Sequence, residues 1–99
     1  MITIRATRLI AVDIDETLVI WNGDNYSLNG ECLIKIMQFH SRGHSLIAWS
    51  AGGAEWAEAV VKQFNLEKYF VACMGKFDWF IDDKPADQFM GENIRVLPS

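Results

Sequence analysis

Two pairs of carboxylates are the residues of this 99-residue sequence best suited to chemistry. Asp13 and Asp15 are two positions apart and follow an apolar run, whereas Asp82 and Asp83 are adjacent and come much later. Carboxylates that are packed together repel one another, which costs stability unless a cation lies among them. Hard oxygen ligands favour magnesium over zinc. If the fold brings the two pairs together, the sequence predicts a divalent-metal site.

A second group of residues is suited to an anion. Ser50 is followed by Ala51-Gly-Gly53 at an expected helix start, where free backbone N–H groups and the helix dipole favour a phosphate. Lys76 adds a positive charge that can neutralise the same anion. Lys62 and Lys84 are alternatives for this role, although Lys62 falls on the polar side of an expected helix and Lys84 directly follows the acid pair.

Apolar runs predict the strands that position these residues. Residues 9–12 and 45–49 lack polar alternation, which is typical of parallel strands that are covered on both faces. Weaker strand candidates are residues 69–73, 79–81 and 94–97. Ligands of open α/β sheets gather at the carboxyl ends of the strands, and the residues named above follow four of these runs. We therefore expect them at one edge of the sheet.

Helical spacing and turn residues account for the segments between the strands. One helix is expected to end at Arg42-Gly43, a second to follow Gly52-Gly53, and a short third to run from Pro85 to Gly91. Asn22-Gly23 favours a tight turn, so residues 17–26 are expected to form a hairpin flap beyond the first strand. This order predicts an α/β sandwich around a mostly parallel sheet of about five strands.

Composition limits the class of protein. A chain of 99 residues with 51% apolar content is expected to form a single domain. The formal charge is −4 and the basic residues are scattered, so nucleic-acid binding is not favoured. Residues 9–12 are too short for a signal-peptide core, and no apolar run is long enough to span a membrane. Cys32 and Cys73 lack CxxC spacing and suit a reducing compartment, so we expect a cytoplasmic protein.

The order of these motifs resembles that of the haloacid dehalogenase (HAD) superfamily, in its magnesium-dependent phosphatase branch. The family signature Asp-x-Asp-x-Thr matches Asp13-Ile-Asp-Glu-Thr17, and the Ser/Thr, lysine and acid-pair motifs match Ser50, Lys76 and Asp82-Asp83. Glu16 stands where many members have glycine. The resemblance covers most of the chain and implies a three-layer Rossmann-like sandwich. It also implies that Ser50 and Lys76 hold the phosphoryl oxygens.

The resemblance implies roles for the acidic residues as well. Asp13 would attack phosphorus to form an aspartyl-phosphate, and Asp15 would act as general acid and then as general base. Mg²⁺ would be held by Asp13, the backbone carbonyl of Asp15 and Asp82. Thr17 and Asp83 would support this arrangement. The expected activity is that of a phosphoric monoester hydrolase.

The spacing of the motifs leaves no room for a cap domain. Residues 17–27 can hold little more than a hairpin and residues 73–76 only a turn, so we expect an open site. An open site suits a bulky phosphorylated substrate, such as a phosphoprotein or a nucleic-acid end, that supplies its own lid. A homodimer whose second subunit closes the cleft is the alternative. Trp21 and Tyr26 in the flap are candidates for contact with the substrate or with that subunit.

Two other classes of function fit part of the pattern. A receiver-type signalling domain also uses acids, a Ser/Thr, a lysine and magnesium, but its phosphorylated aspartate follows a middle strand of the sheet. A non-catalytic or regulatory phosphate-binding protein of the same fold would keep the motifs without turnover. Release of phosphate from a generic aryl phosphate in the presence of magnesium would distinguish a phosphatase from both.

Overall fold

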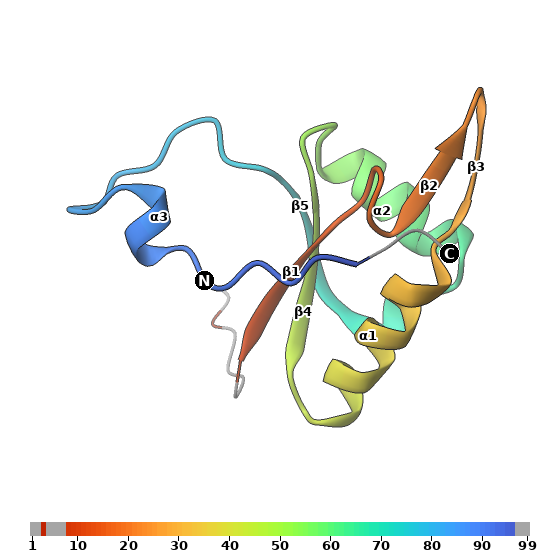
Figure 1. Ribbon diagram of the computed structural model, residues 1–99, viewed down its shortest axis with the longest axis horizontal. Helices are drawn as coiled ribbons and strands as arrows, with labels where there is room; N and C mark the ends of the chain where they lie inside the picture. The colour runs from red at the N-terminus through yellow and green to blue at the C-terminus, as the bar shows by residue number, and fades with distance from the viewer. Residues whose placement is uncertain (1–2, 4–7, 97–99) are drawn as a thin grey trace.

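A parallel three-stranded sheet forms the centre of the structure, a computed structural model that describes residue 3 and residues 8–96 (Figure 1). Its strands are β1 (Leu9–Asp13), β4 (Ser45–Ser50) and β5 (Phe70–Gly75), in the order β1-β4-β5. The register places Asp13 beside Trp49 and Ser50 beside Gly75. The carboxyl ends of all three strands therefore lie at one edge, as the sequence predicts.

A hairpin is the only regular structure between the first strand and the first helix. It consists of β2 (Val19–Asn22) and β3 (Asn25–Leu28), which pair in antiparallel fashion. Gly23 in the turn has a φ of 64°, a left-handed conformation that glycine adopts without strain. The expected hairpin flap is thus confirmed, and Figure 1 shows it projecting beyond the end of β1.

Two helices form the second layer. The first, α1 (Gly30–Ser41), begins after its N-cap Asn29 and ends at the C-cap Arg42, which confirms the expected end at Arg42-Gly43. The second, α2 (Ala54–Gln63), follows Gly53, and a short 3-10 helix, η1 (Glu67–Tyr69), leads into β5. No helix in the described part of the chain is long and apolar enough to cross a membrane.

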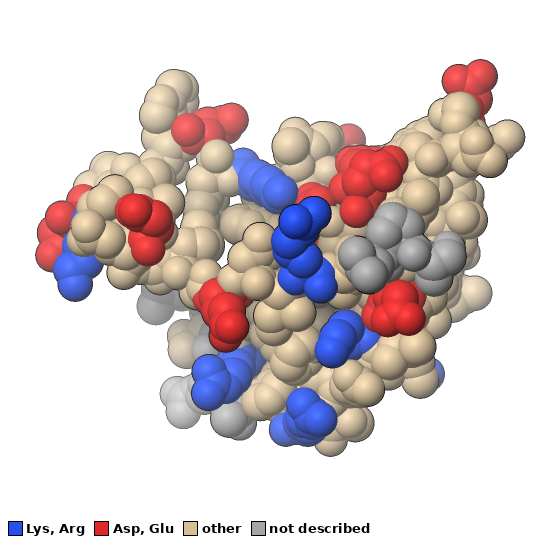
Figure 2. Space-filling model, viewed as in Figure 1, with Lys and Arg blue, Asp and Glu red and all other residues tan. Residues whose placement is uncertain are grey.

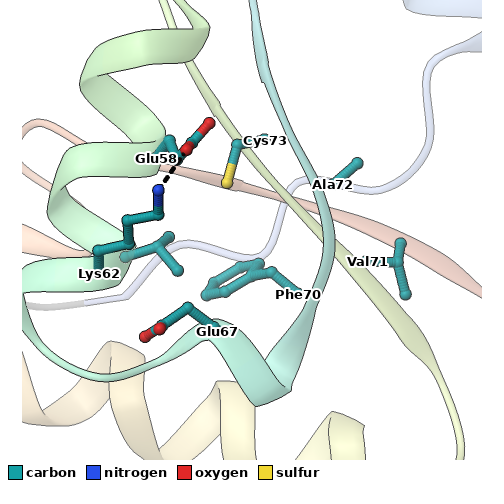
Figure 3. A pocket seen from close by; sticks show the side chains of 8 residues that line it. Glu58, Lys62, Glu67, Phe70, Val71, Ala72 and Cys73 are labelled. Carbon is teal, nitrogen blue, oxygen red and sulfur yellow. Dashed lines mark hydrogen bonds and ion pairs between the residues drawn. The ribbon is translucent and has the colours of Figure 1, made fainter.

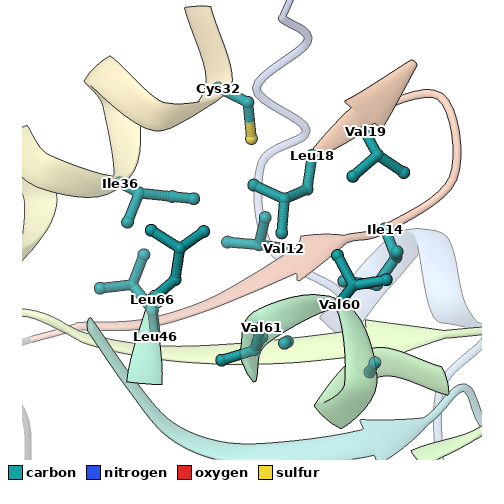
Figure 4. Packing of buried hydrophobic residues seen from close by; sticks show 12 residues of the cluster. Val12, Ile14, Leu18, Val19, Cys32, Ile36, Leu46, Val60, Val61 and Leu66 are labelled. Carbon is teal, nitrogen blue, oxygen red and sulfur yellow. The ribbon is translucent and has the colours of Figure 1, made fainter. Parts of the chain in front are cut away.

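The hydrophobic core lies between this pair of helices and one face of the sheet (Figure 4). Cys32 and Ile36 from α1, Leu46 from β4, and Val60 and Val61 from α2 belong to a single buried cluster. Both helices therefore cover the same face of the sheet. Along β4 the exposed fraction alternates, because every second side chain points into this core.

The opposite face of the sheet has no comparable layer among the described residues. Ile47 and Trp49 of β4 are only partly buried there. The short helix α3 (Ala86–Phe89) contributes no residue to the core cluster and stands on the far side of the sheet from α1 and α2 in Figure 1. The described residues thus form two layers of an α/β fold, without the third layer of the expected sandwich.

Two of the expected strands are not formed. Residues 79–81 are irregular, with Trp79 90% and Ile81 104% exposed. Residues 94–96 are also irregular, and Leu97 lies outside the described residues. Only residues 76–78 separate β5 from the run at 79–81, whereas a parallel crossover takes about a dozen residues or more. The expected five strands are therefore found as three parallel strands and a separate hairpin.

Candidate active site

Asp13, the last residue of β1, contacts two of the other predicted site residues. The Nζ atom of Lys76 lies 3.2 Å from Oδ1 of Asp13, and Thr17 donates its hydroxyl hydrogen to Oδ2 at 3.0 Å. Lys76 immediately follows β5, so the ion pair joins the ends of two strands that are not neighbours in the sheet. The Asp13 side chain is 34% exposed and accessible to a ligand from solvent.

A tight turn after β1 separates the two acids of the signature. The carbonyl oxygen of Ile14 accepts the backbone N–H groups of Thr17, Leu18 and Val19 at 3.0 to 3.2 Å. Ile14 is fully buried, while Asp13 and Asp15 on either side of it are partly exposed. Side chains of an extended chain alternate between its two faces, so the spacing of two keeps both carboxylates out of the core.

Asn29 fixes this turn to the start of α1. It is fully buried, its Nδ2 donates to the carbonyl of Thr17 at 2.9 Å, and its Oδ1 accepts the N–H of Glu31 at 3.2 Å. Its backbone N–H also donates to the carbonyl of Leu18 at 2.8 Å. The sequence predicts no role for Asn29. A polar residue before a helix indicates an N-cap, but its contact with Thr17 depends on the tertiary fold.

Two tryptophans bind the carboxylate of Asp15. The indole nitrogen of Trp21, in β2, donates to Oδ1 at 2.8 Å, and that of Trp56, in α2, donates to Oδ2 at 3.2 Å. Trp21 lies in the predicted flap, whereas the helical spacing of Trp56 with Ala57, Val60 and Phe64 predicts a core residue. Trp56 is partly buried and packs against the core, yet its polar N–H group faces the acid. Helical spacing indicates on which side of the helix the Trp56 ring lies but not where its N–H group points.

Ser50 organises the turn between β4 and α2. Its hydroxyl oxygen accepts the N–H of Gly52, and its carbonyl accepts the N–H groups of Gly53 and Lys76, all at 3.0 Å. Gly53 has a φ of 103°, which requires glycine. A Cβ atom on Gly52 would lie 3.2 Å from the ring of Trp56. The glycines therefore allow the turn, the serine and the Trp56 ring to pack closely, and the serine itself is 1% exposed.

Among the three candidate lysines, Lys76 is the one that contacts a predicted site residue. Its ammonium group also lies 5.4 Å from the centre of the Trp49 ring. Lys62 instead pairs with Glu58 at 2.6 Å, and this hydrogen bond raises its pKa. The pair lines a pocket of about 170 Å³ between α2 and β5, which includes none of the predicted site residues (Figure 3). Lys84 lies in the irregular segment beyond β5.

The second acid pair is not joined to the first. Asp82 and Asp83 are exposed, and an oxygen of Asp82 accepts the backbone N–H of Lys84 at 3.0 Å. Within the described residues, no three His, Cys, Asp or Glu side chains come together in a way that could hold a metal ion. The expected set of Asp13, Asp15 and Asp82 is therefore not assembled, because residues 79–81 do not form the strand that would carry Asp82 to the edge.

The remaining carboxylates do not fit a divalent cation by themselves. One oxygen of Asp13 faces the ammonium group of Lys76, and both oxygens of Asp15 accept indole N–H groups. Magnesium requires near-octahedral oxygen coordination and usually keeps several waters. In this geometry the oxygens of Asp13 and Asp15 already contact an ammonium group, a hydroxyl group and two indole N–H groups.

The negative charge of Asp13 affects the pKa of a thiol in the core. Burial, and after it the negative charge of Asp13, raises the pKa of the Cys32 thiol to about 11. Cys32 therefore stays protonated near neutral pH and acts as a small core residue. Burial also raises the pKa of Cys73. Both cysteines are free, as the sequence analysis expects.

Charged side chains are mixed on the face of the molecule shown in Figure 2. Lys and Arg side chains alternate with Asp and Glu side chains, and no continuous basic surface is visible there. The chain matches no protein-family model, no curated protein and no solved structure. The geometry of the site therefore carries the functional argument alone. It pairs the carboxylate of Asp13 with the ammonium group of Lys76, and Asp15 follows Asp13 by two positions.

Proposed function

We propose that the protein is a phosphatase of the haloacid dehalogenase type that hydrolyses a phosphate monoester. The contact between Asp13 and Lys76 supports this most strongly, because it places a carboxylate and an ammonium group 3.2 Å apart at the edge of a parallel sheet. A phosphoryl group inserted here would place an oxygen against Lys76 and its phosphorus against Asp13. The lysine would then neutralise the charge that otherwise repels the attacking carboxylate.

Hydrolysis would proceed by two displacements. In the first, an oxygen of Asp13 bonds to phosphorus as the bond to the leaving oxygen breaks, and protonated Asp15 gives its proton to that oxygen. In the second, Asp15 takes a proton from water as the water attacks phosphorus, which breaks the aspartyl-phosphate bond and releases phosphate. Lys76 and the hydroxyl of Ser50 would hold the phosphoryl oxygens, since Ser50 accepts the Gly52 hydrogen bond and keeps its own hydrogen.

We also propose Mg²⁺ as a cofactor, although the residues at the edge do not fit it as they stand. Asp82 is the further carboxylate that such a site would need beside Asp13 and the Asp15 carbonyl. Asp82 follows Lys76 after a short irregular segment, and it would have to move from its present position to join Asp13 at the edge.

A bulky phosphorylated substrate suits the open edge. Among the described residues, the hairpin projects beyond the end of β1 at this edge (Figure 1), and Trp21 in the hairpin is 37% exposed. A phosphoprotein or a nucleic-acid end would cover the site with its own surface, and a second copy of the chain that contacts Trp21 or Tyr26 is the alternative lid.

Phosphate release from an aryl phosphate, with magnesium and with chelator, tests the proposed activity. We expect slow but measurable turnover that requires Asp13 and Lys76, followed by discrimination among phosphorylated metabolites, peptides and nucleic-acid ends. Absence of turnover on every substrate would refute the proposed phosphatase activity.

The separation of Asp82 from Asp13 favours a second candidate, a phosphate-binding protein without turnover. In that case inorganic phosphate would perturb the NMR signals of Ser50, Gly52 and Lys76 while no phosphate ester is hydrolysed. Turnover that disappears with Asp13→Asn would exclude this candidate.

A further inference from the structure

The carboxylate of Asp15 is held from two sides by separate parts of the fold. Trp21 reaches Oδ1 from the hairpin at 2.8 Å, and Trp56 reaches Oδ2 from the first turn of α2 at 3.2 Å. Each carboxylate oxygen of Asp15, the proposed proton-transfer residue, thus accepts a hydrogen bond from a different indole.

We infer that Trp21 and Trp56 are positioning residues for proton transfer by Asp15. This inference rests on the proposed phosphatase function. A carboxylate oxygen has two lone pairs, and each indole occupies one of them, which leaves one per oxygen for a proton or a water. Two fixed donors also limit rotation of the carboxyl group. The remaining lone pairs of Asp15 therefore keep a constant direction relative to the adjacent Asp13.

The indoles can act this way because their own rings are restrained. The rings of Trp21 and Trp56 stack with their centres 6.2 Å apart and their planes inclined by 28°, and Tyr26 packs against both at 4.7 and 5.6 Å. The backbone N–H of Trp21 donates to Glu16, in the turn that carries Asp15. Hairpin, turn and helix α2 thus form one aromatic cluster around the acid, consisting of Trp21, Tyr26 and Trp56.

The Gly52 turn adds a further constraint on Trp56. A side chain on Gly52 would meet the Trp56 ring at 3.2 Å and the Ser50 hydroxyl at 3.3 Å. The same packing that shapes the proposed phosphate turn therefore sets the position of the indole that binds Asp15. Phosphate binding and proton transfer are connected through this ring.

A loss of the indole N–H should affect proton transfer more than the attack by Asp13. Trp21→Phe and Trp56→Phe keep an aromatic ring but remove the donor. Displacement of a catalytic group by about 1 Å can cost up to a hundredfold in rate, and we expect about a tenfold loss of kcat/KM on an alkyl phosphate for each variant. An aryl phosphate has a good leaving group that needs little protonation, so its kcat/KM should fall by less than about threefold.

Trp79→Phe is the matched control. Trp79 is 90% exposed and has no contact with Asp15, so the same substitution there should leave the ratio of the alkyl and aryl kcat/KM values unchanged. Since kcat/KM reports only the first displacement, the ratio between substrates isolates protonation of the leaving oxygen. An equal loss on alkyl and aryl phosphates in Trp21→Phe and Trp56→Phe would overturn the inference.

An NMR measurement separates this inference from the proposed function. In Asp15→Ala, the indole N–H signals of Trp21 and Trp56 should shift, while that of Trp79 should stay in place. Unchanged Trp21 and Trp56 signals would overturn the inference even in an active enzyme. If the wild type hydrolyses no phosphate ester but these signals do shift, the contacts exist and the catalytic role is refuted together with the proposed function.

Discussion

The carboxyl edge of the main sheet and the segment beyond β5 contain similar side chains but hold them very differently. At the edge, Asp13 is the last residue of β1, which pairs along its whole length with β4, and its carboxylate contacts Lys76 and Thr17. In residues 77–96, Asp82 also follows an apolar run, yet that run is irregular and exposed. The apolar run before Asp13 pairs with another strand and packs under the helices, and this fixes the position of the acid. The run before Asp82 does neither.

The physical difference lies in what each run can bury. Val12 of β1 and Leu46 of β4 face the layer formed by α1 and α2, and both are buried. Trp79 and Ile81 have no such layer, since the described residues place both long helices on the other face. Apolar character is therefore necessary for a buried strand but does not by itself provide a partner.

The largest expected effect concerns Asp13 at the well-formed edge. Asp13→Asn should lower phosphate-ester hydrolysis by at least about a thousandfold, because a carboxamide does not attack phosphorus. The matched control is Asp87→Asn on exposed α3, which should retain full activity. Steady-state rates on one aryl phosphate measure both. Activity of Asp13→Asn within about tenfold of wild type would remove the functional distinction between the two regions.

Stability should distinguish the regions next. Leu46→Ala removes a fully buried side chain from the core and should lower the free energy of unfolding by about 2–5 kcal/mol. Ile81→Ala, at a fully exposed position, should change it by less than about 0.5 kcal/mol. Denaturant unfolding of both variants provides the measurement. A large decrease in the free energy of unfolding of Ile81→Ala would contradict the exposed position of residues 79–81.

The pKa of Cys32 predicts a pH dependence that belongs to the packed region alone. The folded thiol titrates at about 11 and the unfolded one at 9.0, so the unfolded state loses its proton first as the pH rises. Stability should be unaffected below pH 9 and should fall between pH 9 and 11 by up to about 2.7 kcal/mol. Cys32→Ala should flatten this part of the curve. If the free energy of unfolding depended on pH in the same way in the wild type and in Cys32→Ala, the buried, protonated Cys32 thiol would be contradicted.

How much of the fold the sequence predicts depends on how local the signals are. The end of α1 at Arg42 and the hairpin turn at Gly23 follow from capping and turn residues and are found as expected. The failed strand at 79–81 depends on a partner strand and a covering layer, which are properties of the whole fold. The residue pattern of a short run carries no information about a partner strand or a covering layer.

The same distinction applies to the site. Asp13, Ser50 and Lys76 are predicted correctly as strand-end residues because β1, β4 and β5 form, although their roles stay predictions. The roles of Asn29 and Trp56 cannot be read from local spacing. Asn29 contacts Thr17 across 12 positions, and Trp56 contacts Asp15 across 41 positions.

A smaller effect would sharpen the comparison by showing whether the two regions act together. If magnesium joins Asp82 to Asp13, metal at about tenfold excess over Kd should stabilise the folded state by about 1.4 kcal/mol and raise Tm by roughly 4–8 °C. Asp82→Asn should lose this shift, whereas Asp87→Asn should keep it. Melting curves with magnesium and with chelator test this. A full shift in Asp82→Asn would show that the distant acid does not bind the metal.

The central claim, that Asp13 becomes phosphorylated, can be tested directly by trapping the intermediate. Borohydride reduces an acyl phosphate to an alcohol, so treatment during turnover should convert Asp13 to homoserine, which peptide mass spectrometry can locate. The conversion should require substrate, should be absent in Asp13→Asn, and should increase in Asp15→Asn because the second displacement then lacks its base. Phosphate release by the wild type with Asp13 unmodified, or with another residue modified instead, would contradict the proposed mechanism.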